Sequence, residues 1–136
     1  MTPASGFDIP WCVDLCRRRY AEPMDLGALA DFLAAQIPDP AALFERTDRA
    51  FTVTRIAQVY FWPRTAAHML ILVADGRPGA VWDIVRLARS AKRWAAARGA
   101  MRLSLGAETG VDFAPVARAI GATLAPPCYA VALTRR

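Results

Sequence analysis

The stretch Val81 to Gly99, VWDIVRLARSAKRWAAARG, decides the fold because it predicts one long amphipathic helix. At about 100° per residue, its apolar side carries Trp94, Leu87, Ala91, Ile84, Ala95, Ala88, Val81 and Val85. Its polar side carries Asp83, Ser90, Arg86, Arg93 and Arg89. This spacing is typical of a helix that lies on a sheet. Lys92 falls inside the apolar arc, so we expect its ammonium group to reach the rim of the packed face.

One tryptophan falls on the polar side of the same helix. Positions 82, 86, 89 and 93 follow helical spacing, so the side chains of Trp82, Arg86, Arg89 and Arg93 are expected to form one stripe. Tryptophan and arginine are enriched at binding hot spots, so the stripe is a candidate surface for an acidic protein partner. Two alternatives stay open, namely a solvated face with Arg86 stacked on Trp82, or burial of Trp82 under another segment.

The composition describes a globular chain of 136 residues, 55% hydrophobic and 21% charged, which we expect to form a single domain over residues 1–136. The longest apolar run, Met69 to Ala74, is too short to span a bilayer. No basic-then-apolar signal opens the chain, so we expect a cytoplasmic protein without a membrane span. The net charge is +5, but the arginines are scattered without a recognition motif, which disfavours nucleic acid as the partner.

The cysteines and the single histidine predict no metal site. Cys12 and Cys16 lie four residues apart on an expected helix, and Cys128 is far along the chain. One histidine cannot complete a zinc set with them, and an odd cysteine count argues against a disulfide framework. We therefore expect the cysteines to be small buried hydrophobes and His68 to be structural.

Three further helices are predicted, over Ile9 to Tyr20, Leu26 to Ile37 and Val111 to Ile120. Asp8 and Asp25 are the expected N-caps of the first two, and Gly121 is the expected C-cap of the third. Arginines 17–19 close the first helix and are expected to be solvated. The residues expected to share one face of the second helix are Leu26, Leu29, Leu33 and Ile37.

Four segments are rich in branched or aromatic residues and predict strands, namely Ala50 to Trp62, His68 to Ala74, Met101 to Leu105 and Thr123 to Leu133. Turns are expected at residues 47–49 and 63–67. Residues 41–46 stay open between a helical turn and a strand, and residues 1–9 between a loop and a short edge strand. This order of elements predicts an α/β or α+β layered domain.

Several of these segments resemble the GNAT family of N-acetyltransferases. The strand HMLILVA is followed by the loop DGRPGA and the long helix, and RWAAARGAMRLSL resembles the family's "WARERGAKRI" entry into the next strand. VARAIGA resembles the family's "fYrrlGF" helix end, and FDIPWCVDLCRRRY resembles its opening "aDIpelv.L". The resemblance covers most of the chain. It implies the acyl-CoA N-acyltransferase fold, a mixed central sheet flanked by helices.

The resemblance also implies where a cofactor would bind. The family holds acetyl-CoA with the pattern Arg/Gln-x-x-Gly-x-Gly/Ala, whose N–H groups cradle the pyrophosphate at a helix start. Read from Arg77, this chain places Ala80 and Trp82 at the glycine positions, and counting back from Trp94 instead places Trp82 at the first of them. In either alignment the bulky Trp82 stands where a small residue is expected, and Pro78 removes one donor. We therefore expect no bound cofactor, with acetyl-CoA as the alternative. In that case the binding residues are Arg77, Gly79, Ala80 and Val81.

The family's catalytic residues are implied in the same way. The tyrosine that protonates the leaving thiolate aligns with Ala117, and Tyr129 is the remaining candidate acid. The glutamate base aligns with a strand that offers only Gln58, which leaves Glu45 and Glu108 by elimination. If the chain is an enzyme, Tyr129 and Glu108 are the predicted catalytic pair.

With its altered cofactor loop and without the family's tyrosine, this chain resembles short GNAT-like proteins encoded in the structural regions of tailed phages, including an internal virion protein of podophages. This resemblance implies a non-catalytic structural or interaction protein that is cytoplasmic when synthesised and then virion-associated. The alternative function is an acetyl-CoA-dependent N-acyltransferase of unknown acceptor.

Overall fold

The computed structural model describes residues 1–58, 63–105 and 114–122. The elements in chain order are β1 (Thr2–Pro3), the short 3-10 turn η1 (Gly6–Asp8), α1 (Ile9–Arg19), α2 (Leu26–Gln36), β2 (Ala42–Arg46), β3 (Ala50–Gln58), β4 (Thr65–Ala74), α3 (Ala80–Ala97), β5 (Leu103–Leu105) and α4 (Ala114–Ile120). The segment 41–46, left open by the sequence, is therefore a strand, and the first residues include a short edge strand.

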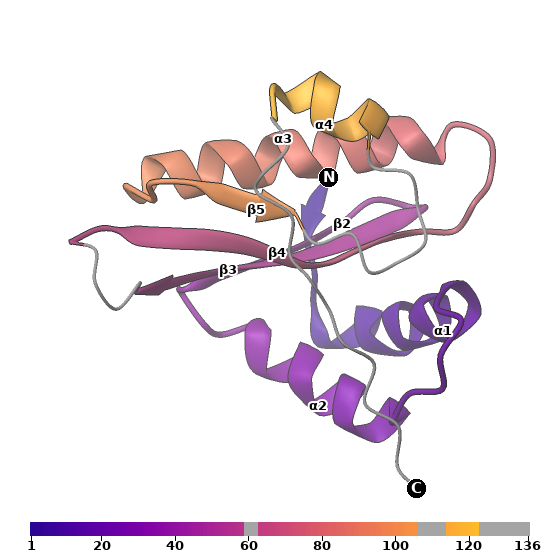
Figure 1. Cartoon of the computed structure of the whole chain (residues 1–136). Coiled ribbons are helices and arrows are strands. Elements are labelled where there is room, and N and C mark those ends of the chain that lie inside the picture. The colour runs from indigo at the N-terminus through magenta and orange to yellow at the C-terminus, as the bar shows by residue number, and fades with distance from the viewer. Residues whose placement is uncertain (59–62, 106–113, 123–136) are drawn as a thin grey trace, which may run out of the picture.

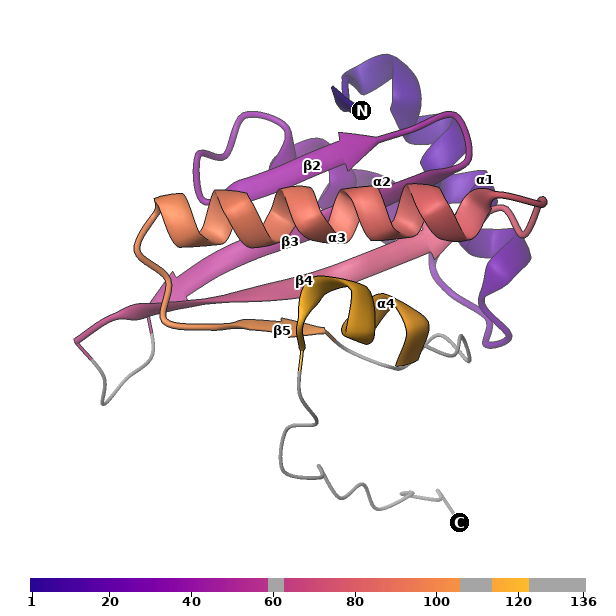
Figure 2. The ribbon, with the colours of Figure 1, turned by 90° about the horizontal axis from the view of Figure 1, so that it is seen from above.

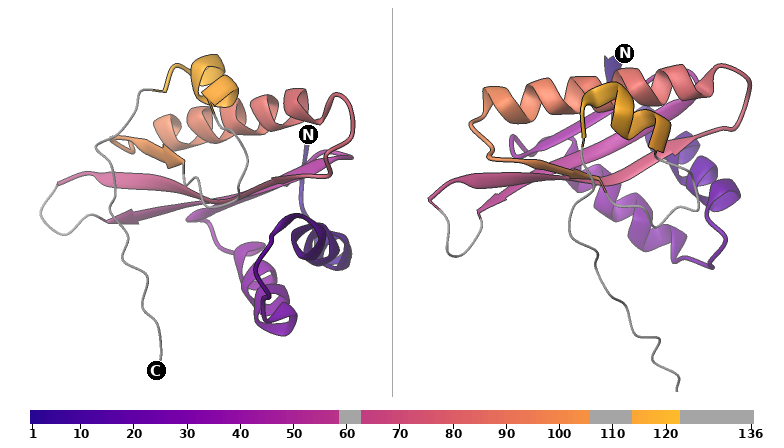
Figure 3. Two further views of the ribbon diagram at one scale, coloured as in Figure 1. Left: turned by 45° about the vertical axis from the view of Figure 1, so that its right-hand side comes forward. Right: turned by 45° about the horizontal axis from the view of Figure 1, so that its top comes forward.

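The strands form one mixed sheet in the order β1-β2-β3-β4-β5. Neighbouring strands are antiparallel except β4 and β5, which are parallel and are joined through α3. Helices α1 and α2 lie on one face of the sheet, and α3 and α4 lie on the other (Figures 1 and 3). The predicted layered fold with a mixed sheet between helices is confirmed.

Strands β3 and β4 form the longest pairing in the sheet, from Ala50 opposite Ala74 to Gln58 opposite Thr65. The predicted turn at 63–67 is wrong from Thr65 onward, because residues 66 and 67 are small, fully buried alanines that continue the pairing with β3. The register shifts where Val53 faces Ile71 and the next residue faces Met69, which leaves Leu70 as an extra residue on β4. The strand predicted over Ala50 to Trp62 is confirmed through Gln58.

Each face of the sheet has its own core. Between the sheet and α1, Phe51 is fully buried against the rings of Trp11 and Phe44, with centroid distances of 6.1 and 5.8 Å. Cys12 and Cys16 are buried in the same core as free thiols, as predicted. Burial raises the pKa of both thiols to about 12. Within the described residues no cluster of potential ligands could hold a metal ion, and no helix is long and apolar enough to cross a membrane.

Helix α3 runs along the other face of the sheet (Figure 2) and begins and ends within two residues of its predicted bounds. Its buried residues include Ile84, Val85, Leu87, Ala88, Ala91 and Ala95, as the pattern predicted. Two expectations for its first turn are wrong. Asp83 is only 5% exposed although it was placed on the polar side, because its carboxylate accepts a hydrogen bond from Thr47 in the β2–β3 turn. Val81 was placed on the apolar side, but it is 45% exposed.

Lys92 lies at the rim of α3, as predicted, because its ammonium group donates to the carbonyl oxygen of Ile120 at 2.6 Å. That oxygen is at the end of α4, where cations are favoured. Of the helix predicted over Val111 to Ile120, the part from Ala114 is observed, and residues 111–113 lie outside the described residues. Gly121 follows this helix with φ +75°.

The two predicted N-caps have different outcomes. The side chain of Asp25 accepts from the Ala28 N–H at 3.0 Å, so the cap of α2 is confirmed. Asp8 makes no side-chain cap bond to α1, so that prediction is wrong. Its carboxylate instead accepts from the Ser5 N–H at 2.9 Å and pairs with Arg46 at 2.7 Å.

The end of α2 also differs from its predicted face. Ile37 is 38% exposed, and Gln36 is buried in its place. The Gln36 oxygen accepts from the Arg55 guanidinium of β3, and that guanidinium also pairs with Asp39. The hydrogen-bonded polar group is therefore the one that faces the sheet.

Candidate functional site

A cavity of about 260 Å³ opens at the end of β4, between the first turn of α3 and the last residues of α1. Its apolar wall is formed by Leu72, Val73, Ala74, Ile84 and Val116. The rest of its lining comes from the end of α1, the loop after β4 and the start of α3, and consists of Arg19, Tyr20, Gly76, Arg77, Gly79, Ala80 and Val81. The cavity is therefore apolar along the strand and polar at the loop that follows it.

The same stretch of β4 has a free edge within the described part of the chain. Strand β5 pairs with β4 only along Ala67 to Met69, whereas β3 covers the other edge of β4 as far as Ala74. Residues 72–74 line the cavity beyond the end of that parallel pairing. Backbone N–H and C=O groups on a strand edge can pair with the amide groups of a ligand.

The loop from β4 to α3 needs glycine at two positions. Gly76 and Gly79 have φ values of +81° and +85°, in the left-handed region that other residues avoid. Gly79 is the N-cap of α3, an 18-residue helix, so the positive end of the helix dipole points at this loop. The Ala80 N–H donates to the Arg77 oxygen at 3.1 Å, whereas the N–H groups of Gly79 and Val81 have no acceptor among the described residues. These two groups are available to an anion.

Arg19 brings a positive charge to the same loop from α1. Its guanidinium lies over Gly76, where an added Cβ would stand only 2.8 Å from one of its nitrogens. The neighbouring Arg17 and Arg18 both pair with Asp14, at 2.7 and 2.9 Å. Arg19 has no ion pair among the described residues, so its charge is free for a ligand.

Arg77 is held differently. Its backbone N–H donates to Asp75 at 2.9 Å, and its guanidinium forms an ion pair with the same carboxylate. Burial acts to raise the pKa of Asp75, but these hydrogen bonds outweigh it and lower that pKa below its ordinary value. Arg77 therefore lines the cavity with its charge already matched.

The four residues predicted to bind a cofactor all line this one cavity, namely Arg77, Gly79, Ala80 and Val81. Trp82 was expected to obstruct them, and that reason is wrong. Its side chain is 69% exposed and is not part of the cavity wall.

The candidates for catalysis that lie within the described residues, Glu45, Gln58 and His68, do not line the cavity. Glu45 accepts a hydrogen bond from Ser90 of α3 at 2.6 Å, and Gln58 is exposed at the end of β3. His68 is half-buried on β4 outside the cavity wall. Glu108 and Tyr129, like Cys128 and the predicted strand 123–133, lie outside the described residues.

Arg19 and Tyr20 were missed by sequence reasoning. A signal for Arg19 does exist, because Asp14 stands three and four residues before Arg17 and Arg18 and can pair with both. Arg19 is then the arginine left without a partner on its own helix.

The predicted stripe on α3 lies on the outside of the molecule. Trp82, Arg86, Arg89 and Arg93 are all exposed, which excludes burial of Trp82 under the described residues. Arg86 pairs with Asp83, and the described arginines that stack on tryptophan rings are Arg46 on Trp11 and Arg98 on Trp94. The alternative in which Arg86 stacks on Trp82 is therefore not observed among the described residues.

No family model matches this sequence, and no curated protein matches it. Solved structures do match along almost the whole chain. An aminoglycoside 6'-N-acetyltransferase from Acinetobacter haemolyticus is 12% identical with a TM-score of 0.74, covering 99% of this chain and 98% of its own. A Trypanosoma brucei acetyltransferase is 12% identical with a TM-score of 0.73, covering 97% of each chain. An aminoglycoside acetyltransferase from an uncultured soil metagenomic sample, solved with sisomicin, is 13% identical with a TM-score of 0.67, covering 99% and 95%. The fold is therefore that of the GNAT acetyltransferases.

Proposed function

We propose that this chain binds an acyl-coenzyme A, with acetyl-CoA as the simplest case, and transfers the acyl group to an amine. One observation carries the proposal. The glycine loop, residues 75–79, leads into α3, where the Gly79 and Val81 N–H groups have no acceptor among the described residues. It opens onto a cavity that continues along the part of the β4 edge that no described strand covers.

The two ends of the cavity suit the two ends of such a ligand. The N–H groups of Gly79 and Val81, the helix dipole and the guanidinium of Arg19 together favour a pyrophosphate. The edge of β4 suits the amide groups of the pantetheine arm, because a strand edge pairs with extended amides. The apolar wall suits the hydrocarbon parts of that arm. With Trp82 outside the cavity, the expectation of no cofactor loses its steric reason.

Acyl transfer needs two proton movements at the reacting centre. The amine nitrogen attacks the thioester carbonyl and loses a proton, the C–S bond breaks, and the leaving thiolate takes up a proton. No carboxylate lines the described part of the cavity wall. Glu108 as the base and Tyr129 as the acid therefore stay our proposal for these two roles.

Calorimetric titration with acetyl-CoA tests the proposal. The wild-type protein should bind, and Arg19→Gln should weaken binding by about 10-fold or more, because a charge-assisted hydrogen bond is lost. Arg18→Gln is the matched control, since it removes the same charge from the same helix turn but contributes nothing to the cavity wall. Absence of binding heat for the wild type, or equal weakening in both variants, would overturn the proposal.

A second candidate is the predicted role as an interaction protein, which the 69% exposure of Trp82 beside Arg86 favours. The partner would be acidic, and its binding would weaken as salt rises. The expected place in a phage particle stays a prediction of this candidate. Size-exclusion chromatography of wild type and the Trp82→Ala/Arg89→Glu variant is the test. Unchanged assembly, with the fold intact by circular dichroism, would leave the stripe as ordinary surface.

A further inference from the structure

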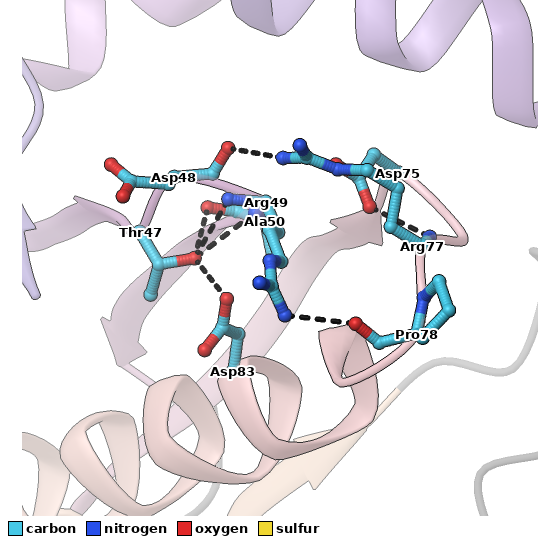
Figure 4. A network of polar contacts seen from close by, with 8 residues as sticks. All are labelled: Thr47, Asp48, Arg49, Ala50, Asp75, Arg77, Pro78 and Asp83. Atoms are coloured by element: carbon cyan, nitrogen blue, oxygen red, sulfur yellow. Dashed lines mark hydrogen bonds and ion pairs between the residues drawn. The ribbon is translucent and has the colours of Figure 1, made fainter.

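The turn between β2 and β3 is bonded to the glycine loop and to the start of α3 (Figure 4). The Asp75 N–H donates to the Arg49 carbonyl oxygen at 2.8 Å, and the Arg77 guanidinium donates to the Asp48 carbonyl oxygen at 3.3 Å. The Arg49 guanidinium donates to the Pro78 carbonyl oxygen at 2.9 Å. The loop is therefore fastened to the turn at both of its ends.

The turn itself has a rigid base. The Thr47 hydroxyl oxygen accepts from the N–H groups of Arg49 and Ala50, at 3.2 and 3.1 Å, and its O–H faces the buried carboxylate of Asp83 at 3.0 Å. Asp83 is in the first turn of α3, where a negative charge is favoured by the helix dipole. The Thr47 hydroxyl therefore links the turn to the start of α3, and its bond to the Arg49 N–H holds the backbone from which the Arg49 side chain extends.

The guanidinium of Arg49 has a close fit to the loop. An added Cβ on Gly79 would stand 2.6 Å from its Nη1, so the guanidinium packs directly against the bare glycine. Its bond to Pro78 is its one side-chain hydrogen bond among the described residues, and Arg49 is not part of the cavity wall. It therefore acts on the backbone of the loop from outside the cavity.

This bond sets the direction of the Gly79 N–H. The Pro78–Gly79 peptide is planar and trans, so its N–H points opposite to its C=O. With the Pro78 oxygen held by Arg49, the Gly79 N–H is turned away from Arg49, which does not line the cavity, whereas Gly79 does. The same residue that lacks an N–H, Pro78, thereby supplies the carbonyl group that orients the next donor.

We infer that Arg49 is a positioning residue for acyl-CoA binding. It fixes the glycine loop in the shape that presents the Gly79 N–H to the pyrophosphate and does not itself contact the ligand. This inference rests on the proposed function.

The test compares Arg49→Gln, Arg49→Lys and the control Arg64→Gln. Arg64 is exposed beside the first residue of β4, at the end away from the loop, so its variant removes the same charge from elsewhere. Calorimetry should show that Arg49→Gln weakens acetyl-CoA binding by about 10-fold, the equivalent of one charge-assisted hydrogen bond. Arg49→Lys should recover part of the affinity, because an ammonium group can still donate to the Pro78 oxygen. Arg64→Gln should bind like the wild type.

Two further readouts separate positioning from direct contact and from general loss of structure. Hydrogen exchange of the free protein should become faster in Arg49→Gln at the Ala80 and Trp82 amides, whose bonds to Arg77 and Gly79 depend on the shape of the loop. The salt dependence of acetyl-CoA binding should be the same in Arg49→Gln and Arg64→Gln, because neither side chain touches the ligand. A salt dependence that falls only in Arg49→Gln would show direct contact and overturn the positioning role.

The acetyl-CoA titration separates the role of Arg49 from acyl-CoA binding itself. Wild-type protein that binds no acetyl-CoA would overturn the proposed function, and the role of Arg49 with it. Binding by the wild type and equally by Arg49→Gln would overturn the role of Arg49 alone.

Discussion

Replacing Gly79 by alanine should cost more stability than the same change at Gly99, although both glycines have a positive φ, +85° and +76°. The left-handed backbone costs a non-glycine residue about 1–2 kcal/mol, and this part is common to both variants. An added Cβ at Gly99 meets nothing within 4 Å, whereas at Gly79 it stands 2.6 Å from Arg49 Nη1. Because that atom ends a flexible side chain, it would move aside and give up its bond to Pro78. We expect this to add about 1 kcal/mol, the typical net contribution of one hydrogen bond, because this bond is exposed.

The assay is urea unfolding of Gly79→Ala and Gly99→Ala, each in the wild-type and in an Arg49→Ala background. The Arg49→Ala background removes the displaced bond, so the extra cost of Gly79→Ala should fall there by about 1 kcal/mol, while the cost of Gly99→Ala should not change. In thermal unfolding this coupling corresponds to a difference of roughly 3 °C for a domain of this size. A cost of Gly79→Ala that is the same in both backgrounds would show that the added Cβ does not displace the Arg49–Pro78 bond.

Two other predictions concern the core between the helices and the sheet. Thr54 is fully buried and its hydroxyl has no partner among the described residues, so Thr54→Val should raise stability by about 1 kcal/mol. Thr52→Val is the matched control and should lower stability by about 1 kcal/mol, since the Thr52 hydroxyl donates to the Ile71 oxygen at 2.8 Å; thermal shifts of equal sign would contradict this. The folded pKa of Cys12 and Cys16 is raised from 9.0 to about 12, so the unfolded thiols ionise first as pH rises. The free energy of unfolding should therefore fall between pH 9 and pH 12 by about 1.4 kcal/mol per pH unit for each thiol. If the urea midpoint of a Cys12→Ala/Cys16→Ala variant has the same pH dependence as that of the wild type, the thiols are not the cause.

The elements of this fold follow from local patterns, which is why most of them could be predicted. The apolar spacing of α3 needs only its own residues, and its buried face from Ile84 to Ala95 agrees with the wheel. Asp83 could not be placed in the same way. Its partner Thr47 is 36 residues earlier in the chain, and only the packing of the β2–β3 turn on α3 brings them together. The extra residue Leu70 on β4 was missed for a similar reason, because a register shift depends on both strands.

The part of the candidate site that consists of consecutive residues could be predicted. The part that depends on how distant elements pack together could not. A strand, a glycine loop and a helix in succession pointed to residues 75–80, and this loop does border the cavity. The expectation that Trp82 blocks cofactor binding was wrong, because a bulky residue at a glycine position blocks a site only if it faces that site. Arg19 and Arg49 reach the loop from other elements, and nothing local to the loop indicates them.

A backbone amide NMR titration with acetyl-CoA tests most directly whether an acyl-CoA binds where the glycine loop meets the part of the β4 edge that no described strand covers. The largest shift changes should fall at Gly76, Gly79, Ala80 and Val81 and along residues 70–74, with Val53 and Leu33 in the opposite core unchanged. Saturable changes elsewhere, for example along the outer face of α3, or no changes at millimolar acetyl-CoA, would contradict binding at this place.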